Sequence, residues 1–405
     1  MARMRRVAWL TCEPERPPTR IRSGDVSCDD RRVPRVTLIS DLRRAFDPNA
    51  DPRNVAMIRR RHDFWAELSR LHGWDLAVCD AAEVEAPGRA ASVCWIDLPM
   101  LTRSAYRAVF SRATAAGAAC VLQHPDEVEQ VLGLDRSYPV LVRAGIPTPR
   151  TAFVPVDDAL ADAIDSPAAV RRLLTEQIYG ALFDEGLDPH DGIFVRGFYS
   201  SAKSANPEHY FGNNQADIEA TVHEVLRRLR VGLEVGGLAL RQHLALDRIE
   251  LAEAPGDRDA IRVSFEVRLT VLQGRVLCAS FHGPFDVFAE GPRRALTEAL
   301  AARHAAAGEA IRALLPRLLA ADLPPSYVAD VAFTREGDPV VLELNPLYAA
   351  GYNVPPAHAL VVAALGADLA CRAGYPELSW TEILETAASL AGEPVEQSPA
   401  VWLFR

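Results

Sequence analysis

Two acidic side chains and one amide fall within a single apolar segment, YVADVAFTREGDPVVLELNP, which spans residues 327–346. Residues two apart on a β-strand face the same side, so Glu343 and Asn345 share one face. Asp330 lies on the preceding strand of the same predicted hairpin. Two carboxylates in apolar surroundings are costly unless a cation neutralises them, and Mg²⁺ favours such oxygen ligands. The segment therefore predicts a magnesium site; the alternative is a solvent-facing hairpin whose acids keep it soluble.

A second segment, GIFVRGFYSSAKSANPEHYFGNN (residues 192–214), combines an apolar strand with a loop of small residues. Arg196 sits on the strand and Lys203 on the loop just beyond it. Cationic donors at a strand end, followed by a loop that can cover a ligand, are suited to gripping phosphates. The alternative is a surface loop with an ordinary lysine.

Two further strands carry cations among apolar residues. In LALRQHLALD (residues 238–247), Arg241 begins a stretch that is either a plain edge strand or a hinge strand whose backbone recognises adenine. His243 in that stretch has no partner visible in the sequence, so we interpret it as a packed residue rather than a general base. In RVSFEVRLTVLQGRVL (residues 262–277), Glu266 and Arg268 share the polar face. They form a weak exposed pair, or Arg268 points into a cleft and holds a phosphate or carboxylate.

The elements that must position these residues alternate between strand and helix in the first part of the chain. Short apolar runs at 7–11, 36–39, 76–78 and 93–96 predict strands, and residues 55–71 have helical periodicity. The second part predicts a short helix pair, strands and an amphipathic helix over 216–232. The last part predicts strands at 238–246, 261–271, 275–281, 327–333 and 340–344, with a long helix over 294–320 that Pro316 kinks or breaks. We expect an α/β (α+β) protein with parts at 1–125, 126–235 and 236–405.

Composition narrows the class of protein. The formal net charge of −10 over 405 residues argues against a nucleic-acid partner, which normally meets a basic surface. No run approaches the roughly 18 apolar residues of a membrane span, and the apolar stretch near the N-terminus is too short for a signal peptide. The seven cysteines are scattered without a C-x-x-C pair. We therefore expect a cytoplasmic protein with no membrane or nucleic-acid partner, and the Ala/Arg-rich composition suggests a bacterial source.

Taken in order, the four segments resemble the ATP-grasp superfamily over residues of about 120 to 355. AGIPTPRT is similar to the entry into its central subdomain, and VADVAFTREGDPVVLELNP is the most specific match. FVRGFYSSAKSA and LALRQHLAL further resemble an atypical clade in which arginines replace some nucleotide-binding lysines. That clade includes a cell-division-cycle branch that assists assembly of a translation initiation factor. The absence of Walker A and G-x-G-x-x-G sequences disfavours P-loop and dinucleotide-binding proteins.

The resemblance implies an N-terminal Rossmann-like pre-ATP-grasp domain and two α+β lobes that grip ATP. It implies a ligase that joins a carboxylate to an amine through an acylphosphate, acting on a small molecule or peptide. The alternatives are a non-catalytic ATP-binding assembly factor and a small-molecule kinase; a homodimer is possible for any of them. The implied cofactors are ATP and Mg²⁺. By resemblance, Arg196 and Lys203 contact phosphates, Arg241 and the backbone of Gln242, His243 and Leu244 meet adenine, Arg268 and Lys203 serve catalysis, and Asp330, Glu343 and Asn345 bind magnesium.

Overall fold

The computed structural model describes residues 35–40, 52–81, 92–98, 102–156, 166–199, 211–227, 236–251, 261–283, 290–349 and 354–404. These residues fall into two compact units. Unit 1 is drawn from residues 1–97, 111–122 and 366–377, and unit 2 from residues 98–110, 123–365 and 378–405. The expected strand at 7–11 lies outside the described residues. The expected division into three parts, at residues 125 and 235, stays a prediction.

Unit 1 contains a four-stranded parallel sheet in the order β2-β1-β3-β4. Its strands are β1 (Arg35–Ser40), β2 (Asp75–Asp80), β3 (Ser92–Asp97) and β4 (Ala118–Leu122). The strand predictions at 36–39, 76–78 and 93–96 are confirmed, as is the helix predicted over 55–71, which is α2 (Pro52–His72). Apolar side chains such as Leu38 and Ile96 are almost fully buried, as expected for strands covered on both faces.

Polar residues end the strands of this sheet. Ser40 is aligned with Asp80 on one side and with Asp97 on the other. Helix α2 contributes Arg61, which forms a buried ion pair with Asp97, and His62, whose Nε2 lies 2.9 Å from Ser40 Oγ. Burial, and then the positive charge of Arg61, lower the pKa of His62 to about 4. His62 is therefore neutral at physiological pH.

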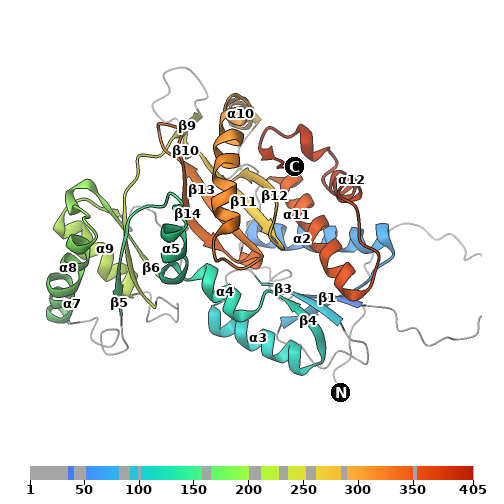
Figure 1. The fold of residues 1–405 in the computed structure, drawn as a ribbon, viewed down its shortest axis with the longest axis horizontal. Coiled ribbons are helices and arrows are strands. Elements are labelled where there is room, and N and C mark those ends of the chain that lie inside the picture. The colour runs from blue at the N-terminus through green and yellow to red at the C-terminus, as the bar shows by residue number, and fades with distance from the viewer. Residues whose placement is uncertain are drawn as a thin grey trace, which may run out of the picture. The chain divides into compact units, whose positions relative to one another are not determined.

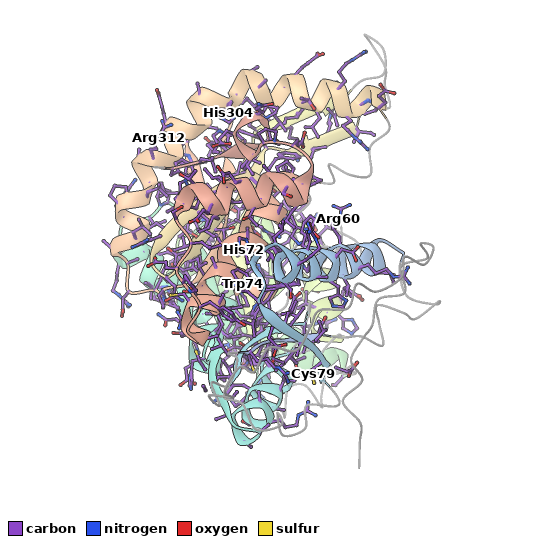
Figure 2. The ribbon with its side chains drawn as sticks, turned by 90° about the vertical axis from the view of Figure 1, so that its right-hand side faces the viewer. Arg60, His72, Trp74, Cys79, His304 and Arg312 are labelled. Carbon is purple, nitrogen blue, oxygen red and sulfur yellow. The ribbon has the colours of Figure 1, made fainter. Side chains whose placement is uncertain are left out.

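Aromatic stacking closes the end of α2. The ring of His72 stacks on that of Trp74, with centroids 4.7 Å apart, and both are labelled in Figure 2. The hydroxyl of Tyr375 accepts a hydrogen bond from the backbone N–H of Asp75. These contacts fix the turn between α2 and β2.

The smaller sheet of unit 2 has the antiparallel order β5-β8-β6-β7. Its inner face packs against helices α7, α8 and α9, drawn in green in Figure 1. The buried side chains between them include Val195, Leu238, Leu240, Ile218 and Val222. The elements are β5 (Thr151–Pro155), α7 (Pro167–Leu173), a π-helical turn (Leu174–Ile178), α8 (Tyr179–Asp184), β6 (Ile193–Gly197), β7 (Phe211–Gly212), α9 (Gln215–Arg227) and β8 (Gly237–Gln242).

The larger sheet of unit 2 is antiparallel in the order β14-β13-β11-β12-β15. Helix α10 (Glu290–Ala320) runs along one face of it (Figure 1) and carries buried residues such as Leu300 and Ile311. We expected Pro316 to kink or break this helix; it does not end there but continues for four more residues. The strands are β9 (Arg248–Leu251), β10 (Ile261–Ser264), β11 (Glu266–Leu272), β12 (Arg275–Phe281), β13 (Tyr327–Phe333), β14 (Pro339–Asn345) and β15 (Val401–Trp402).

Two predicted strands are shorter than expected. Residues 261–271 were expected to form one strand, but the chain changes partner at Phe265: β10 pairs with β9, whereas β11 pairs with β12 and β13. The strand expected over 238–246 ends at Gln242, since the N–H of His243 donates to the carbonyl of Gly192 instead of continuing the ladder. The turn at Gln273 and Gly274 is confirmed: both have positive φ, of 51° and 72°, as a tight hairpin turn requires.

The remaining helices of unit 2 have clear end signals. Helix α4 (Pro125–Leu132) begins with a capping box made by His124 and Glu127. Helix α12 (Trp380–Ala391) begins with another, made by Ser379 and Glu382. The other elements are α3 (Arg103–Ala115), α5 (Leu134–Arg143), α11 (Pro355–Ala373) and short 3₁₀ turns at Pro189–Asp191, Leu347–Ala349 and Val395–Gln397.

The C-terminal strand is attached to α10 by stacked rings. His304, labelled in Figure 2, stacks on Trp402 with centroids 4.9 Å apart, and Trp402 Nε1 donates to the backbone carbonyl of His304. Gly308 leaves room for that indole, because a Cβ there would lie 3.2 Å from Trp402 Cδ1. The apolar chain end is thus part of the core of unit 2.

One described helix, α11, is long and apolar enough to cross a membrane by length and composition. Most of it is buried inside the protein, including Leu360 and Leu369 at 0% exposure. Core helices of soluble domains meet the same criterion.

Candidate active site

The β13–β14 hairpin brings the three expected metal ligands together. Asp330 lies directly opposite Glu343, and Val328 opposite Asn345. A register shift follows Asp330, so that Val331 pairs with Val341 and Leu342 is the extra residue of a bulge. Such a bulge re-aims neighbouring side chains. Both carboxylates are buried, at 1% and 7% exposure, which rules out the alternative of a solvent-facing hairpin.

Arg268 on β11 compensates the first carboxylate. It lies opposite Asp330 across the sheet and forms a two-pronged ion pair with it, Nε to Oδ1 at 2.8 Å and Nη2 to Oδ2 at 3.0 Å. His282 Nε2 lies 3.2 Å from Arg268 Nη2, and Asn345 Nδ2 donates to Asp330 Oδ2 at 3.2 Å. The exposed pair of Arg268 and Glu266 that we considered is therefore not what holds Arg268.

Arg196 compensates the second carboxylate from the other sheet of unit 2. Its Nη1 forms an ion pair with Glu343 Oε2, and both side chains are more than nine-tenths buried. The pair joins β6 of the smaller sheet to β14 of the larger one. Without it, a guanidinium and a carboxylate would each be buried alone, which is costly.

Arg241 on β8 is the third buried arginine. Its Nε donates to Thr151 Oγ1 at 3.3 Å, whereas Nη2 is buried and has no hydrogen-bond partner among the described residues. Burial first, and then the nearby charge of Arg196, lower the pKa of Arg241 to about 9, and Glu343 partly offsets both effects. A buried guanidinium with an unused N–H is suited to an arriving anion.

The site has a net positive charge. Three guanidinium groups, on Arg196, Arg241 and Arg268, face two carboxylates, on Asp330 and Glu343. A polyanion such as a nucleotide triphosphate fits this balance, as does the unpartnered N–H of Arg241.

The carboxylates and the Asn345 amide also fit a magnesium ion. Mg²⁺ usually takes one or two carboxylates from the protein and fills its other positions with phosphate oxygens and water. The described residues contain no group of three or more His, Cys, Asp and Glu side chains placed to hold a metal by themselves. The donor set here therefore suits a hard cation that arrives with phosphates.

The other predicted contacts are placed as follows. Gln242 and His243 donate their backbone N–H groups to the carbonyls of Arg150 and Gly192. The His243 ring packs edge-on against Phe211, with centroids 4.8 Å apart, and its pKa is lowered by burial and then by Arg248. This agrees with a packed residue rather than a general base. Lys203 lies outside the described residues, so its expected phosphate contact stays a prediction.

Sequence reasoning missed His282 and Gln123. A period-2 argument could have found His282, because Ser280 lies opposite Arg268 and residues two apart share a face. No local signal marks Gln123, which contacts the hairpin from more than 200 residues away in sequence.

Residues 198–365 match a family model of the ATP-grasp domain, the third family of its clade. Similar solved structures include D-cycloserine synthetase DcsG, at 17% identity over 77% of this chain and 91% of that one, with a TM-score of 0.43. D-alanine–D-alanine ligase from Bacillus anthracis complexed with ATP has 11% identity over 89% and 99%, with a TM-score of 0.49. Cdc123 from Schizosaccharomyces pombe has 13% identity over 55% and 85%, with a TM-score of 0.37. No protein with a curated function matches the sequence.

The matched segment contains most of the site. It includes Arg241, Arg268 and the Asp330, Glu343 and Asn345 hairpin, while Arg196 lies two residues before it. The resemblance that the four sequence motifs indicated is therefore confirmed, and so is the mixed α/β fold. Residues 198–365 are an ATP-grasp domain.

Proposed function

We propose that the protein is an ATP-dependent ligase that joins a carboxylate to an amine, on a small molecule or a peptide. The observation that carries this proposal is the cluster of three buried arginines and two buried carboxylates within an ATP-grasp domain. Phosphoryl transfer depends mainly on positioning and charge neutralisation, and this cluster supplies both without a nucleophilic side chain.

The two ion pairs are exchangeable. When Mg-ATP binds, Arg196 and Arg268 would turn from their carboxylates to phosphate oxygens. Asp330, Glu343 and Asn345 would then hold the metal, whose charge neutralises the phosphates. Every buried charge keeps an opposite partner in both states, so the exchange avoids the cost of leaving one unpaired. Arg241 has an unused N–H for the same phosphates.

The proposed reaction has two steps. An oxygen of the substrate carboxylate attacks the γ-phosphorus and ADP leaves, which forms an acylphosphate. The amine then attacks the acyl carbon, and phosphate leaves with one oxygen of the original carboxylate. Arg268 is placed to stabilise the transferred phosphate or the carboxylate, with Lys203 assisting by analogy with the superfamily. The backbone around Gln242, His243 and Leu244 is the proposed adenine contact.

The first test is turnover. We would incubate the purified protein with Mg-ATP and pools of amino acids and small carboxylates and follow ADP and phosphate release. Release that depends on a particular pool supports the ligase and begins to name its substrate. Glu343→Gln should abolish this release, whereas Glu336→Gln, on the exposed turn of the same hairpin, should not. Full-rate turnover by Glu343→Gln would show that the metal site is wrongly assigned.

A non-catalytic ATP-binding assembly factor is the second candidate. The observation that favours it is that Arg196 and Arg268 already neutralise both carboxylates without a metal. It predicts ATP binding with no ADP release in any pool and a stable protein complex in cell extract. Product phosphorylated without any amine would instead indicate a small-molecule kinase.

A further inference from the structure

Gln123 has an unusual backbone conformation for a residue with a side chain. Its φ is 62°, in the left-handed region, and its exposure is 4%. Such strain persists only where the surrounding structure holds it, and it gathers at functional sites. Gln123 touches none of the arginines or carboxylates in the described bonds, so the proposed chemistry does not account for it.

Three buried hydrogen bonds hold this residue. Its Nε2 donates to the carbonyl of Ser326 at 3.0 Å, and its Oε1 accepts from the N–H of Leu347 at 3.0 Å. Its own carbonyl accepts from the hydroxyl of Tyr106 at 2.7 Å. The side-chain amide therefore uses both its donor end and its acceptor end.

The two bonds of that amide meet both strands of the metal-binding hairpin. Ser326 immediately precedes β13, and Leu347 follows β14 by two residues. These ends are neighbours, because Val328 pairs with Asn345 in the antiparallel register. Gln123 thus bridges the two strands at the end of the hairpin where Asn345 lies.

Stacked tyrosines hold the same turn from the side. Tyr106, which donates to Gln123, stacks on Tyr348 with centroids 4.8 Å apart and 17° between planes. Tyr348 follows Leu347 and is 1% exposed. The chain leaving Asn345 is therefore fixed by one amide and one ring.

We propose that Gln123 is a positioning residue that holds Asn345 against Asp330 in the geometry that binds the metal. This inference rests on the proposed function, because it assumes that the hairpin binds Mg²⁺. Residues that orient metal ligands without touching the metal change affinity by about 10- to 100-fold when they are altered.

The test is Mn²⁺ binding, measured by the loss of the free-ion EPR signal, with and without ATP. Gln123→Glu keeps the shape but replaces the donor to Ser326 with an oxygen, so it should weaken Mn²⁺ binding at least tenfold. Gln123→Gly adopts a positive φ without strain and removes the bridge, and it should weaken binding similarly even if the Glu variant folds poorly. Gln130→Glu is the matched control, since Gln130 also donates to a backbone carbonyl, that of Asp322, and should bind as wild type does.

Two further readouts separate this role from a general loss of structure. Binding of ATP without metal should be unchanged, because the three arginines are untouched. Hydrogen exchange at the Leu347 amide should accelerate in both Gln123 variants. If folded variants bind Mn²⁺ within twofold of wild type, the positioning role is wrong although the ligase proposal stands. If wild type binds no Mn²⁺ even with ATP, the metal site itself is wrong and the inference falls with it.

Discussion

Replacing Glu343 by Gln should destabilise unit 2 as well as stop turnover. The substitution keeps the shape but removes the charge that Arg196 needs, and both side chains of this pair are more than nine-tenths buried. Arg196, Arg241 and Arg268 would then share one carboxylate, Asp330. Breaking one partner of a buried ion pair costs about 3–5 kcal/mol. Against a total stability of about 5–15 kcal/mol, the variant should still fold.

The expected fall in melting temperature follows from that figure. At about 2–4 °C per kcal/mol for a unit of this size, Glu343→Gln should melt roughly 6–20 °C below wild type. Differential scanning calorimetry of the full chain without ligand measures this, with Glu336→Gln as the exposed control. The double variant Arg196→Met with Glu343→Gln should recover part of the loss, because it buries no unpaired charge at this position.

The result that would refute this reasoning is specific. A Glu343→Gln variant that melts within about 2 °C of wild type would mean that the ion pair contributes little. Strictly additive effects of the two substitutions would mean that Arg196 and Glu343 are not energetically coupled. Either outcome would also weaken the proposed exchange of partners on Mg-ATP binding.

The remaining predictions concern an unpaired cation, a buried histidine and a glycine. Arg241→Met should leave the ligand-free melting temperature unchanged or raise it, because it removes a poorly satisfied buried charge, but should weaken ATP binding in titration calorimetry by about 10- to 100-fold; unchanged affinity would exclude Arg241 from the site. His62, with its pKa lowered to about 4, contributes stability that is fully present above pH 6.5 and is lost as pH falls toward 4, about 3 kcal/mol in all; His62→Gln should flatten that part of the urea-midpoint profile, and a parallel profile would contradict the shift. Gly237→Ala should cost about 1–3 kcal/mol in urea unfolding, because its Cβ would lie 2.3 Å from the Phe198 ring, whereas Gly291→Ala on α10 has open space and should not destabilise.

The hairpin was predictable because its information is local. Period-2 alternation in residues 327–345 places Glu343 and Asn345 on one face, and the turn between the strands brings Asp330 beside them. The apolar neighbours of these acids likewise predict their burial. Only the bulge at Leu342 lies beyond this pattern, because a bulge depends on the partner strand.

The partners of the carboxylates were not predictable. Arg196 and Glu343 are 147 residues apart, and nothing in either segment indicates that the two sheets of unit 2 meet at this pair. The sequence marked Arg268 as polar, but its choice of Asp330 over Glu266 depends on β11 lying next to β13. The break of the strand at Phe265 has the same origin, since residues 261–264 have a different partner strand.

The central claim is that ATP activates a carboxylate by phosphorylating it, and oxygen transfer tests this most directly. Once a pool supports turnover, the active carboxylate would be labelled with ¹⁸O in both oxygens and the released phosphate analysed by mass spectrometry. The proposed reaction predicts one ¹⁸O atom in each phosphate, because phosphate leaves the acyl carbon with an oxygen of the substrate. Phosphate released without ¹⁸O while the labelled substrate is consumed would contradict the account.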